Sequence, residues 1–233
     1  PSEFDEEVWV AVGEEAIPST GTAFTIDEGV WMTARHVVDG CTRIGLVVQG
    51  DAGVLAQEIT LAENADLAVV RAPLERVPLA VDLNLDERRL GDSVFLIGYP
   101  QGLPGEAAGK LLGGETMRIR GRYSTREPVL AWAETSRTQG INGTLGGMSG
   151  GPAFDDDGEI IGVTVAEAPR RGRIYTAAPT SLAAALAHAA ATPEPSAPRA
   201  GDLSEENYGV EGRRLRRDLR VAKVQCIVEP GEG

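Results

Sequence analysis

Short apolar stretches separated by turn residues recur along most of the chain. In the first third of the sequence they cover residues 8–12, 22–26, 30–33, 44–48 and 67–70. A second series covers residues 94–97, 116–123, 129–135, 160–165 and 174–177. Stretches of this length, bounded by glycine, proline and aspartate, are typical of β-strands joined by tight turns. The pattern predicts two β units, at about 8–80 and 92–180, joined by a charged connector at 82–91.

The last part of the chain departs from this pattern. Residues 180–190 are rich in alanine and leucine, which favour a helix, and a proline-rich linker follows at 191–201. The tail, residues 202–233, is too short to bury a core of its own, so we expect it to dock on the main body. Within it, residues 220–228 predict one strand. The basic cluster at 213–217 predicts a solvated helix face or a patch that binds acidic groups.

Charge and composition narrow the class of protein. The 233 residues include 22 basic and 35 acidic side chains, a formal net charge of −13. An acidic surface repels phosphate backbones, so we expect no nucleic-acid partner. No apolar run reaches about 18 residues, so we expect no membrane span, although a removed signal peptide or anchor stays open because the sequence starts at Pro1. Two cysteines and two histidines, widely scattered, disfavour a metal site, and no cofactor is expected.

Ser149 is the candidate nucleophile. It lies in Gly-Gly-Met-Ser-Gly-Gly-Pro, residues 146–152. A hydroxyl attacks an amide only when a base takes its proton and donors stabilise the developing oxyanion. Glycines on both sides permit unusual backbone angles and a close approach to a substrate carbonyl. We therefore expect the amides of Gly147 and Ser149 to form an oxyanion hole. The alternative is a glycine-rich turn with an incidental serine.

A base and a carboxylate are available in the first β unit. Only His36 and His188 exist as histidine bases, and His36 directly follows a predicted strand, where it is well placed to face a cleft. Asp66 opens the apolar strand at 67–70. Burial of an unpaired carboxylate is costly, so Asp66 is expected to pair with a group such as an imidazole N–H. The alternatives are a structural histidine and a solvated turn aspartate.

The three segments resemble the catalytic motifs of trypsin-like peptidases. They read Thr-Ala-Arg-His-Val-Val, Ala-Asp-Leu-Ala-Val-Val and Gly-Met-Ser-Gly-Gly-Pro, in that family's order, and are most similar to those of the bacterial Htr/Deg proteases. The resemblance implies an all-β fold: two perpendicular six-stranded β-barrels, a C-terminal helix and a short extra tail, with the protease domain at 1–190. It implies a serine endopeptidase acting on protein or peptide substrates through His36, Asp66 and Ser149. The residues after the linker are too few for a PDZ domain.

The resemblance also places Thr164, Val165, Ala166 and Glu167 along the primary specificity pocket. Glu167 either favours a basic substrate side chain there or points to solvent, and we favour the second interpretation. Neither the physiological substrate nor the oligomeric state follows from the sequence.

The two cysteines bear on location. Cys41 and Cys226 form either a disulfide or two separate buried thiols, and we favour the disulfide, which would attach the tail to the first barrel. Disulfides persist in oxidising compartments. We therefore expect a periplasmic or secreted protein.

Two other functions fit parts of the sequence. Residues 147–151 also match the Gly-x-Ser-x-Gly motif of α/β-hydrolases, and an esterase of that type would use Ser149, one of the aspartates at 155–157, and His188. That fold needs strands alternating with helices before the serine, which the pattern lacks. The other alternative is a protease fold kept as a binding module, with an idle site caused by a collapsed loop at 143–149.

Overall fold

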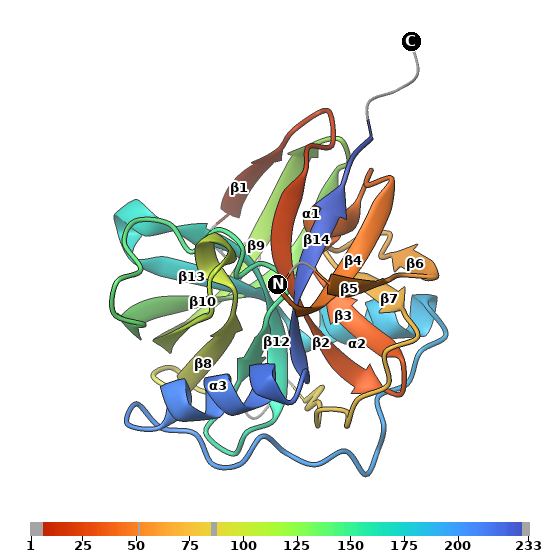
Figure 1. Cartoon of the computed structure of the whole chain (residues 1–233). Helices are drawn as coiled ribbons and strands as arrows, with labels where there is room; N and C mark the ends of the chain where they lie inside the picture. The colour runs from red at the N-terminus through yellow and green to blue at the C-terminus, as the bar shows by residue number, and fades with distance from the viewer. Residues whose placement is uncertain (1–6, 51, 85–87, 230–233) are drawn as a thin grey trace.

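The structure, a computed structural model, describes residues 7–50, 52–84 and 88–229. Its strands form two seven-stranded sheets, which lie side by side in Figure 1. Across the first sheet the order is β5 (Ala52–Leu55), β4 (Arg43–Gln49), β14 (Val221–Ile227), β2 (Ser19–Asp27), β3 (Val30–Thr33), β7 (Ala68–Arg71) and β6 (Glu58–Leu61). Across the second it is β1 (Glu7–Val12), β9 (Gly105–Gly121), β10 (Thr125–Arg137), β13 (Arg173–Ala177), β12 (Ile160–Ala168), β11 (Pro152–Phe154) and β8 (Ser93–Gly98).

Short helices connect and follow these strands. They are α1 (Arg35–Val38), η1 (Pro100–Gly102), η2 (Pro169–Arg171), α2 (Pro179–His188) and α3 (Tyr208–Arg217). Helix α2 is the helix expected at 180–190. Within the described ranges, no helix is long and apolar enough to cross a membrane. The all-β fold class is confirmed, although the ends of the expected domain ranges, residues 1–6 and 230–233, and part of the connector lie outside the described residues.

Each sheet has one strand more than the six expected. In the first sheet the extra strand is β14 from the tail, which lies between β2 and β4 and pairs antiparallel with both (Figure 1). In the second sheet β8 pairs with β9 and closes the ring, and β1 adds to β9 in parallel. Residues 8–12 were expected in the first unit but lie in the second sheet. The difference arises because an alternating pattern predicts a strand but does not say which strand it pairs with.

Apolar side chains fill the interior of both sheets. Phe24 and Trp31 in the first sheet, and Trp132 in the second, have no exposed surface. Burial of one such side chain contributes roughly 1.5–3 kcal/mol. These cores fix the strand ends, and the loops between the strand ends carry the residues of chemical interest.

The tail touches both sheets. The ring of Tyr208 on α3 lies 5.8 Å, centroid to centroid, from that of Phe95 on β8. Beyond α3 the chain enters the first sheet as β14, and Figure 1 shows α3 running past β8 before that strand begins. One segment of about 20 residues therefore connects the two halves of the fold.

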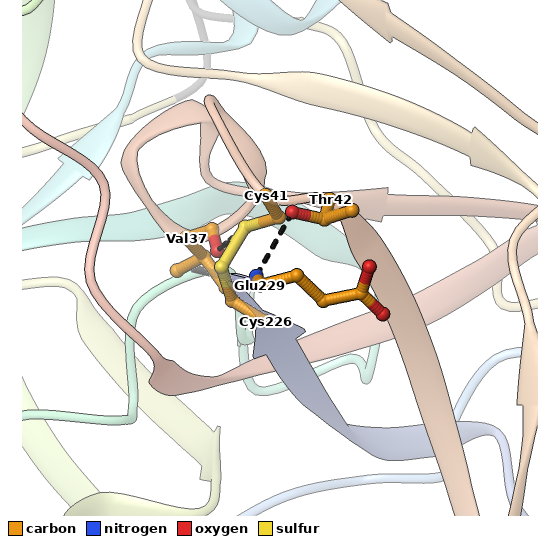
Figure 2. The surroundings of a disulfide bond; sticks show 5 residues. All are labelled: Val37, Cys41, Thr42, Cys226 and Glu229. Atoms are coloured by element: carbon orange, nitrogen blue, oxygen red, sulfur yellow. Dashed lines mark hydrogen bonds between the residues drawn. A yellow bond between two sulfur atoms is a disulfide. The ribbon is translucent and has the colours of Figure 1, made fainter. Parts of the chain in front are cut away.

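A disulfide joins Cys41 and Cys226 (Figure 2), the pairing that the sequence favoured over two thiols. It links the end of β14 to the turn after α1, with 5.4 Å between the two Cα atoms. Beside it, the backbone amide of Glu229 donates to the Thr42 hydroxyl at 3.1 Å. The tail is thus covalently fixed close to the helix that carries His36.

Candidate active site

Helix α1 is a single turn that presents His36. It begins directly after β3, and its next two residues, Val37 and Val38, are buried and anchor the turn. The amide of Arg35 donates to the backbone carbonyl of Asp66 at 3.1 Å, which ties α1 to the chain entering β7. The His36 side chain is 27% exposed, so the ring has one face toward solvent while its backbone is fixed.

Asp66 lies buried beneath this ring, and its carboxylate is fully bonded. Oδ2 is 2.6 Å from Nδ1 of His36, and Oδ1 accepts from the His36 amide at 2.8 Å and from the Tyr123 hydroxyl at 2.6 Å. Because a carboxylate only accepts, Nδ1 carries the proton and Nε2 is left free to act as a base. Burial lowers the pKa of His36, but the charge and hydrogen bond of Asp66 outweigh burial, so this pKa lies above its ordinary value.

Behind Asp66 lies a second buried carboxyl group, on Glu127 of β10. Its Oε1 accepts from the Asp66 amide at 2.6 Å, and its side chain is almost wholly buried. Burial, followed by the nearby charge of Asp66, raises the pKa of Glu127 to about 8. The Glu127 carboxyl is therefore protonated at neutral pH, which avoids two adjacent buried anions.

Neither Glu127 nor Tyr123 was expected at the site from the sequence. A signal for Glu127 does exist: alternate residues of β10 point inward, and Thr125, Glu127 and Val129 occupy these buried positions. An acid at an inward position needs a partner. Nothing in the sequence singles out Tyr123, whose ring lies 4.0 Å from the guanidinium carbon of Arg35.

Ser149 is held between the two sheets by its backbone. Its carbonyl accepts from the Thr22 amide of β2 at 2.9 Å, and the next amide, that of Gly150, donates to the Thr164 carbonyl of β12 at 2.8 Å. Strand β2 pairs with β3, whose last residue, Thr33, comes just before α1. Ser149 is thus hydrogen-bonded to β2, and β2 pairs with β3, the strand that leads into α1 and His36.

Two adjoining cavities bring the candidate base and nucleophile to one cleft. His36 lines a cavity of about 590 Å³ and Ser149 lines a cavity of about 30 Å³, and Ala166 and Glu167 belong to both linings. Within the part of the chain that the structure describes, the Ser149 hydroxyl forms no hydrogen bond. The imidazole–carboxylate pair is formed, whereas the contact between imidazole and hydroxyl is not.

The segment before Ser149, residues 138–148, is an irregular loop; we call it the 138–148 loop. Gly147 has φ +97°, and a Cβ at this position would lie 2.5 Å from the Tyr99 carbonyl oxygen, so only glycine fits. The Gly146 carbonyl accepts from the Gln101 amide at 2.5 Å, and the Gly147 carbonyl accepts from the Thr22 hydroxyl at 2.8 Å. Because C=O and N–H point oppositely across a trans peptide, the Gly147 N–H is directed away from η1.

Two side chains from different elements, Gln101 and Glu167, clamp this loop. Nε2 of Gln101, in η1, donates to the carbonyls of Asn142 and Thr144 at 2.7 and 2.8 Å. From β12, the Glu167 carboxylate accepts from the Leu145 amide at 2.9 Å and from the Thr144 hydroxyl. Glu167 therefore binds the loop, an arrangement that the sequence analysis did not consider.

The other residues expected at the specificity pocket lie along β12. Thr164 and Val165 are buried, and the Thr164 amide donates to the Gly151 carbonyl at 2.9 Å. Ala166 is partly exposed to the cleft. The small cavity beside Ser149 is lined further by Met148 and Ile174, so its walls are largely apolar.

His188 lies elsewhere, at the end of α2. It lines a separate cavity of about 360 Å³ together with Glu63 and Arg126. Over the described residues, the mostly β architecture also lacks the alternating strands and helices that an α/β-hydrolase needs. Among the described residues, no group of three or more histidine, cysteine or acidic side chains is arranged to hold a metal ion.

Comparison with known proteins matches residues 21–163 to the family model of the trypsin-like peptidase domain. Among curated proteins, the chain is 33% identical over 152 residues to Protease Do-like 2, chloroplastic, of Arabidopsis thaliana, which covers 62% of this chain and 23% of that protein. It is 29% identical over 155 residues to a probable periplasmic serine endoprotease DegP-like of Hahella chejuensis, covering 65% and 30%. The matched part spans less than a third of these relatives' length.

Solved structures show the same fold. The active form of the Rv3671c protease from M. tuberculosis superposes with a TM-score of 0.60 at 21% identity, covering 77% of this chain and 82% of that one. The HtrA-type protease AlgW with a decapeptide superposes with a TM-score of 0.56 at 22% identity, covering 73% and 51%.

Proposed function

Since this chain belongs to the family of trypsin-like peptidase domains, of the HtrA/DegP type, we propose that it is a serine endopeptidase with His36 as base, Asp66 as orienting carboxylate and Ser149 as nucleophile. The observation that carries the proposal is the 2.6 Å contact between Nδ1 of His36 and the buried Asp66 carboxylate. It fixes the tautomer in which Nε2 accepts a proton. Ser149 lines the adjoining cavity.

The proposed reaction has two stages. The Ser149 oxygen bonds to the scissile carbonyl carbon while its proton passes to Nε2 of His36, and that proton then leaves with the departing amine. Water, deprotonated by the same imidazole, next attacks the acyl-enzyme and releases Ser149. Asp66 stabilises the imidazolium formed in each stage. The amides of Gly147 and Ser149 would bind the oxyanion. This role agrees with the direction of the Gly147 N–H, which points away from η1 because the Gly146 carbonyl accepts from Gln101.

The cleft favours a small uncharged side chain before the scissile bond. The cavity beside Ser149 holds only about 30 Å³ and has Met148 and Ile174 in its walls. We propose that Thr164, Val165 and Ala166 bind the substrate along β12. Glu167 accepts from the Leu145 amide, and we propose that its carboxylate holds the loop there and does not pair with a basic substrate side chain.

Two observations support a periplasmic or secreted location. The Cys41–Cys226 bond is of a kind that persists in oxidising compartments. Several of the curated relatives are named probable periplasmic serine endoproteases.

Cleavage of labelled casein and labelling by a fluorophosphonate probe test the proposal. We expect the wild-type chain to do both, Ser149→Ala to lose both, and His36→Ala to lose several orders of magnitude in turnover. His188→Ala, the matched control, should keep wild-type rates. Full activity of Ser149→Ala would refute the assignment.

A binding module with an idle site is the second candidate. It is favoured by the Ser149 hydroxyl, which has no hydrogen bond to His36 within the described part of the chain. Failure of the probe to label Ser149 under any condition, with the fold intact by circular dichroism, would support this candidate and exclude the peptidase.

A further inference from the structure

Arg216 on α3 is buried, contrary to the solvated face that the basic cluster predicted. Only 8% of its surface is exposed. One guanidinium nitrogen pairs with the Glu106 carboxylate, and the other donates to the carbonyls of Gly105 and Gly98 at 3.3 and 3.5 Å. The planar guanidinium of a buried arginine bonds its acceptors in a fixed geometry, so Arg216 helps to hold the Glu106 carboxylate and the Gly105 and Gly98 carbonyls in place.

The first of these contacts leads to one end of the 138–148 loop. Oε1 of Glu106 faces Arg216, and Oε2 accepts from the Thr138 hydroxyl at 2.5 Å. The backbones of Glu106 and Thr138 are joined as well, because the Thr138 amide donates to the Glu106 carbonyl at 2.9 Å. Thr138 is the first residue of the loop, so Arg216 and Glu106 together fix where the loop begins.

The second contact leads to the other side of the same loop. Gly98 is followed by Tyr99, whose ring centroid lies 6.0 Å from the Arg216 guanidinium carbon, and then by η1. Gln101 of η1 binds the loop at Gly146 and at two other carbonyls. Arg216 therefore supports both segments that hold the loop.

Other residues of α3 also allow the helix to lie close to Glu106 and to the strands that flank the loop. Gly212 lies one turn before Arg216, and a Cβ at Gly212 would lie 2.5 Å from Oε1 of Glu106. The Tyr208 hydroxyl, one turn earlier, lies 3.0 Å from Oγ of Ser136, two residues before the loop. The same face of α3 thus contacts the loop's anchoring strands along its whole length.

We propose that Arg216 is a positioning residue, through which the C-terminal tail keeps the 138–148 loop, and with it the Gly147 amide, in the arrangement that stabilises the oxyanion. The proposal rests on the proposed function for its catalytic consequence. Its structural part, order in the loop, stands independently. The tail lies outside residues 21–163, the region that matches the family model.

Arg220 provides a matched control in the same tail. It is equally buried, with 6% of its surface exposed, and its guanidinium donates to the carbonyls of Val77, Pro78 and Pro198 at 2.6–3.0 Å. Burial lowers the pKa of Arg220 to about 10. The Arg220 guanidinium thus anchors the tail through carbonyls that belong neither to the loop nor to the residues that clamp it.

The experiment compares Arg216→Met and Arg220→Met in the full chain. Saturation kinetics of fluorophosphonate labelling give a maximal rate and a half-saturating concentration. Hydrogen–deuterium exchange reports order at amides 139–147. We expect both variants to unfold at lower temperature than the wild type. Only Arg216→Met should lower the maximal labelling rate, about 10-fold or more, with little change in half-saturation, and only it should speed exchange in the loop.

Each outcome has one meaning. If both variants label and exchange alike, the proposal is overturned. If the wild type itself does not label while Arg216→Met alone exchanges faster, the proposed function fails but the link from the tail to the loop stands. Should Arg216→Met not fold, Arg216→Lys keeps the charge but loses the forked geometry. A several-fold lower maximal rate is then expected, and an unchanged rate would overturn the proposal.

Discussion

The two halves of the candidate active site are held in different ways. The half with His36 and Asp66 rests on α1 and on the start of β7, and one buried carboxylate accepts three hydrogen bonds. The half with Gly147 and Ser149 lies in and just after an irregular loop that side chains from β2, η1 and β12 hold in place. The first half is fixed by hydrogen bonds that converge on one buried carboxylate, whereas the second depends on separate side chains from three different elements.

This difference teaches which half can vary. Hydrogen bonds to a buried charged group are worth about 1.5–3 kcal/mol each, so the Asp66 cluster resists rearrangement. The clamps on the loop involve exposed residues such as Gln101 and Thr144, whose bonds are weakened by water. We expect substitution of Asp66 to abolish most of the chemical step, and substitution of the side chains that clamp the loop to adjust it.

The largest expected effect comes from Asp66→Asn. Loss of the carboxylate removes the acceptor that fixes the His36 tautomer, and kcat/KM should fall about 10⁴-fold. The charge of Asp66 raises the pKa of His36, so its removal should also move the acid limb of the pH–rate profile to lower pH. Rates across pH 5–9 measure both. Asp39→Asn, which alters the nearby ion pair with Arg35, should stay within about threefold. A fall in kcat/KM of less than tenfold for Asp66→Asn would mean that Asp66 does not orient His36 for the reaction.

A smaller effect is expected from Glu167→Gln in the second half. The amide is a weaker acceptor for the Leu145 N–H, so the loop loosens and kcat should fall about 10-fold, consistent with a bond to a charged group. Glu159→Gln, which removes a surface pair with Arg199, is the control and should match wild type. Casein-derived peptide cleavage gives kcat and KM separately. A change confined to KM for peptides with a basic residue would instead place Glu167 in the substrate pocket.

The smallest effect on activity is expected from Glu127→Gln, whose amide still accepts from the Asp66 N–H. Turnover at pH 7 should stay within about twofold, because Glu127, with a pKa of about 8, is already uncharged. Between its ordinary pKa of 4.5 and 8, folded wild type holds a proton that the unfolded chain releases, so stability falls as pH rises through this window. Glu127→Gln should lose this decline. Thermal unfolding at pH 5 and pH 9 measures it, with the exposed Glu58→Gln as control. Equal slopes would mean that Glu127 is ionised throughout.

The same contrast describes what the sequence could predict. The segments around His36, Asp66 and Ser149 were identifiable because each needs a particular residue type at a strand end or between glycines. Most strands were also predictable, since their apolar runs are bounded by turn residues. The pairing of Cys41 with Cys226 was one of only two interpretations.

The remaining features depend on contacts that no local pattern encodes. Glu167 was assigned to solvent or substrate, because its partner at Leu145 comes close only when the loop folds back over β12. The basic cluster does not predict a buried Arg216, because nothing in its spacing reveals Glu106 opposite; its neighbours Arg213 and Arg217 are indeed exposed. The parallel pairing of β1 with β9 was missed for a similar reason, because it joins segments about 100 residues apart.

The place of β14 between β2 and β4 determines when the first sheet can be completed during synthesis of the chain. Val221 pairs with Phe24, so the gap in the first sheet is filled by a residue made about 200 positions later. At 5–20 residues per second, β2 waits roughly 10–40 s on the ribosome for its neighbour. During that interval the first sheet has no strand between β2 and β4. The sheet that leads into α1 and His36 can therefore be completed only after β14 has emerged from the ribosome.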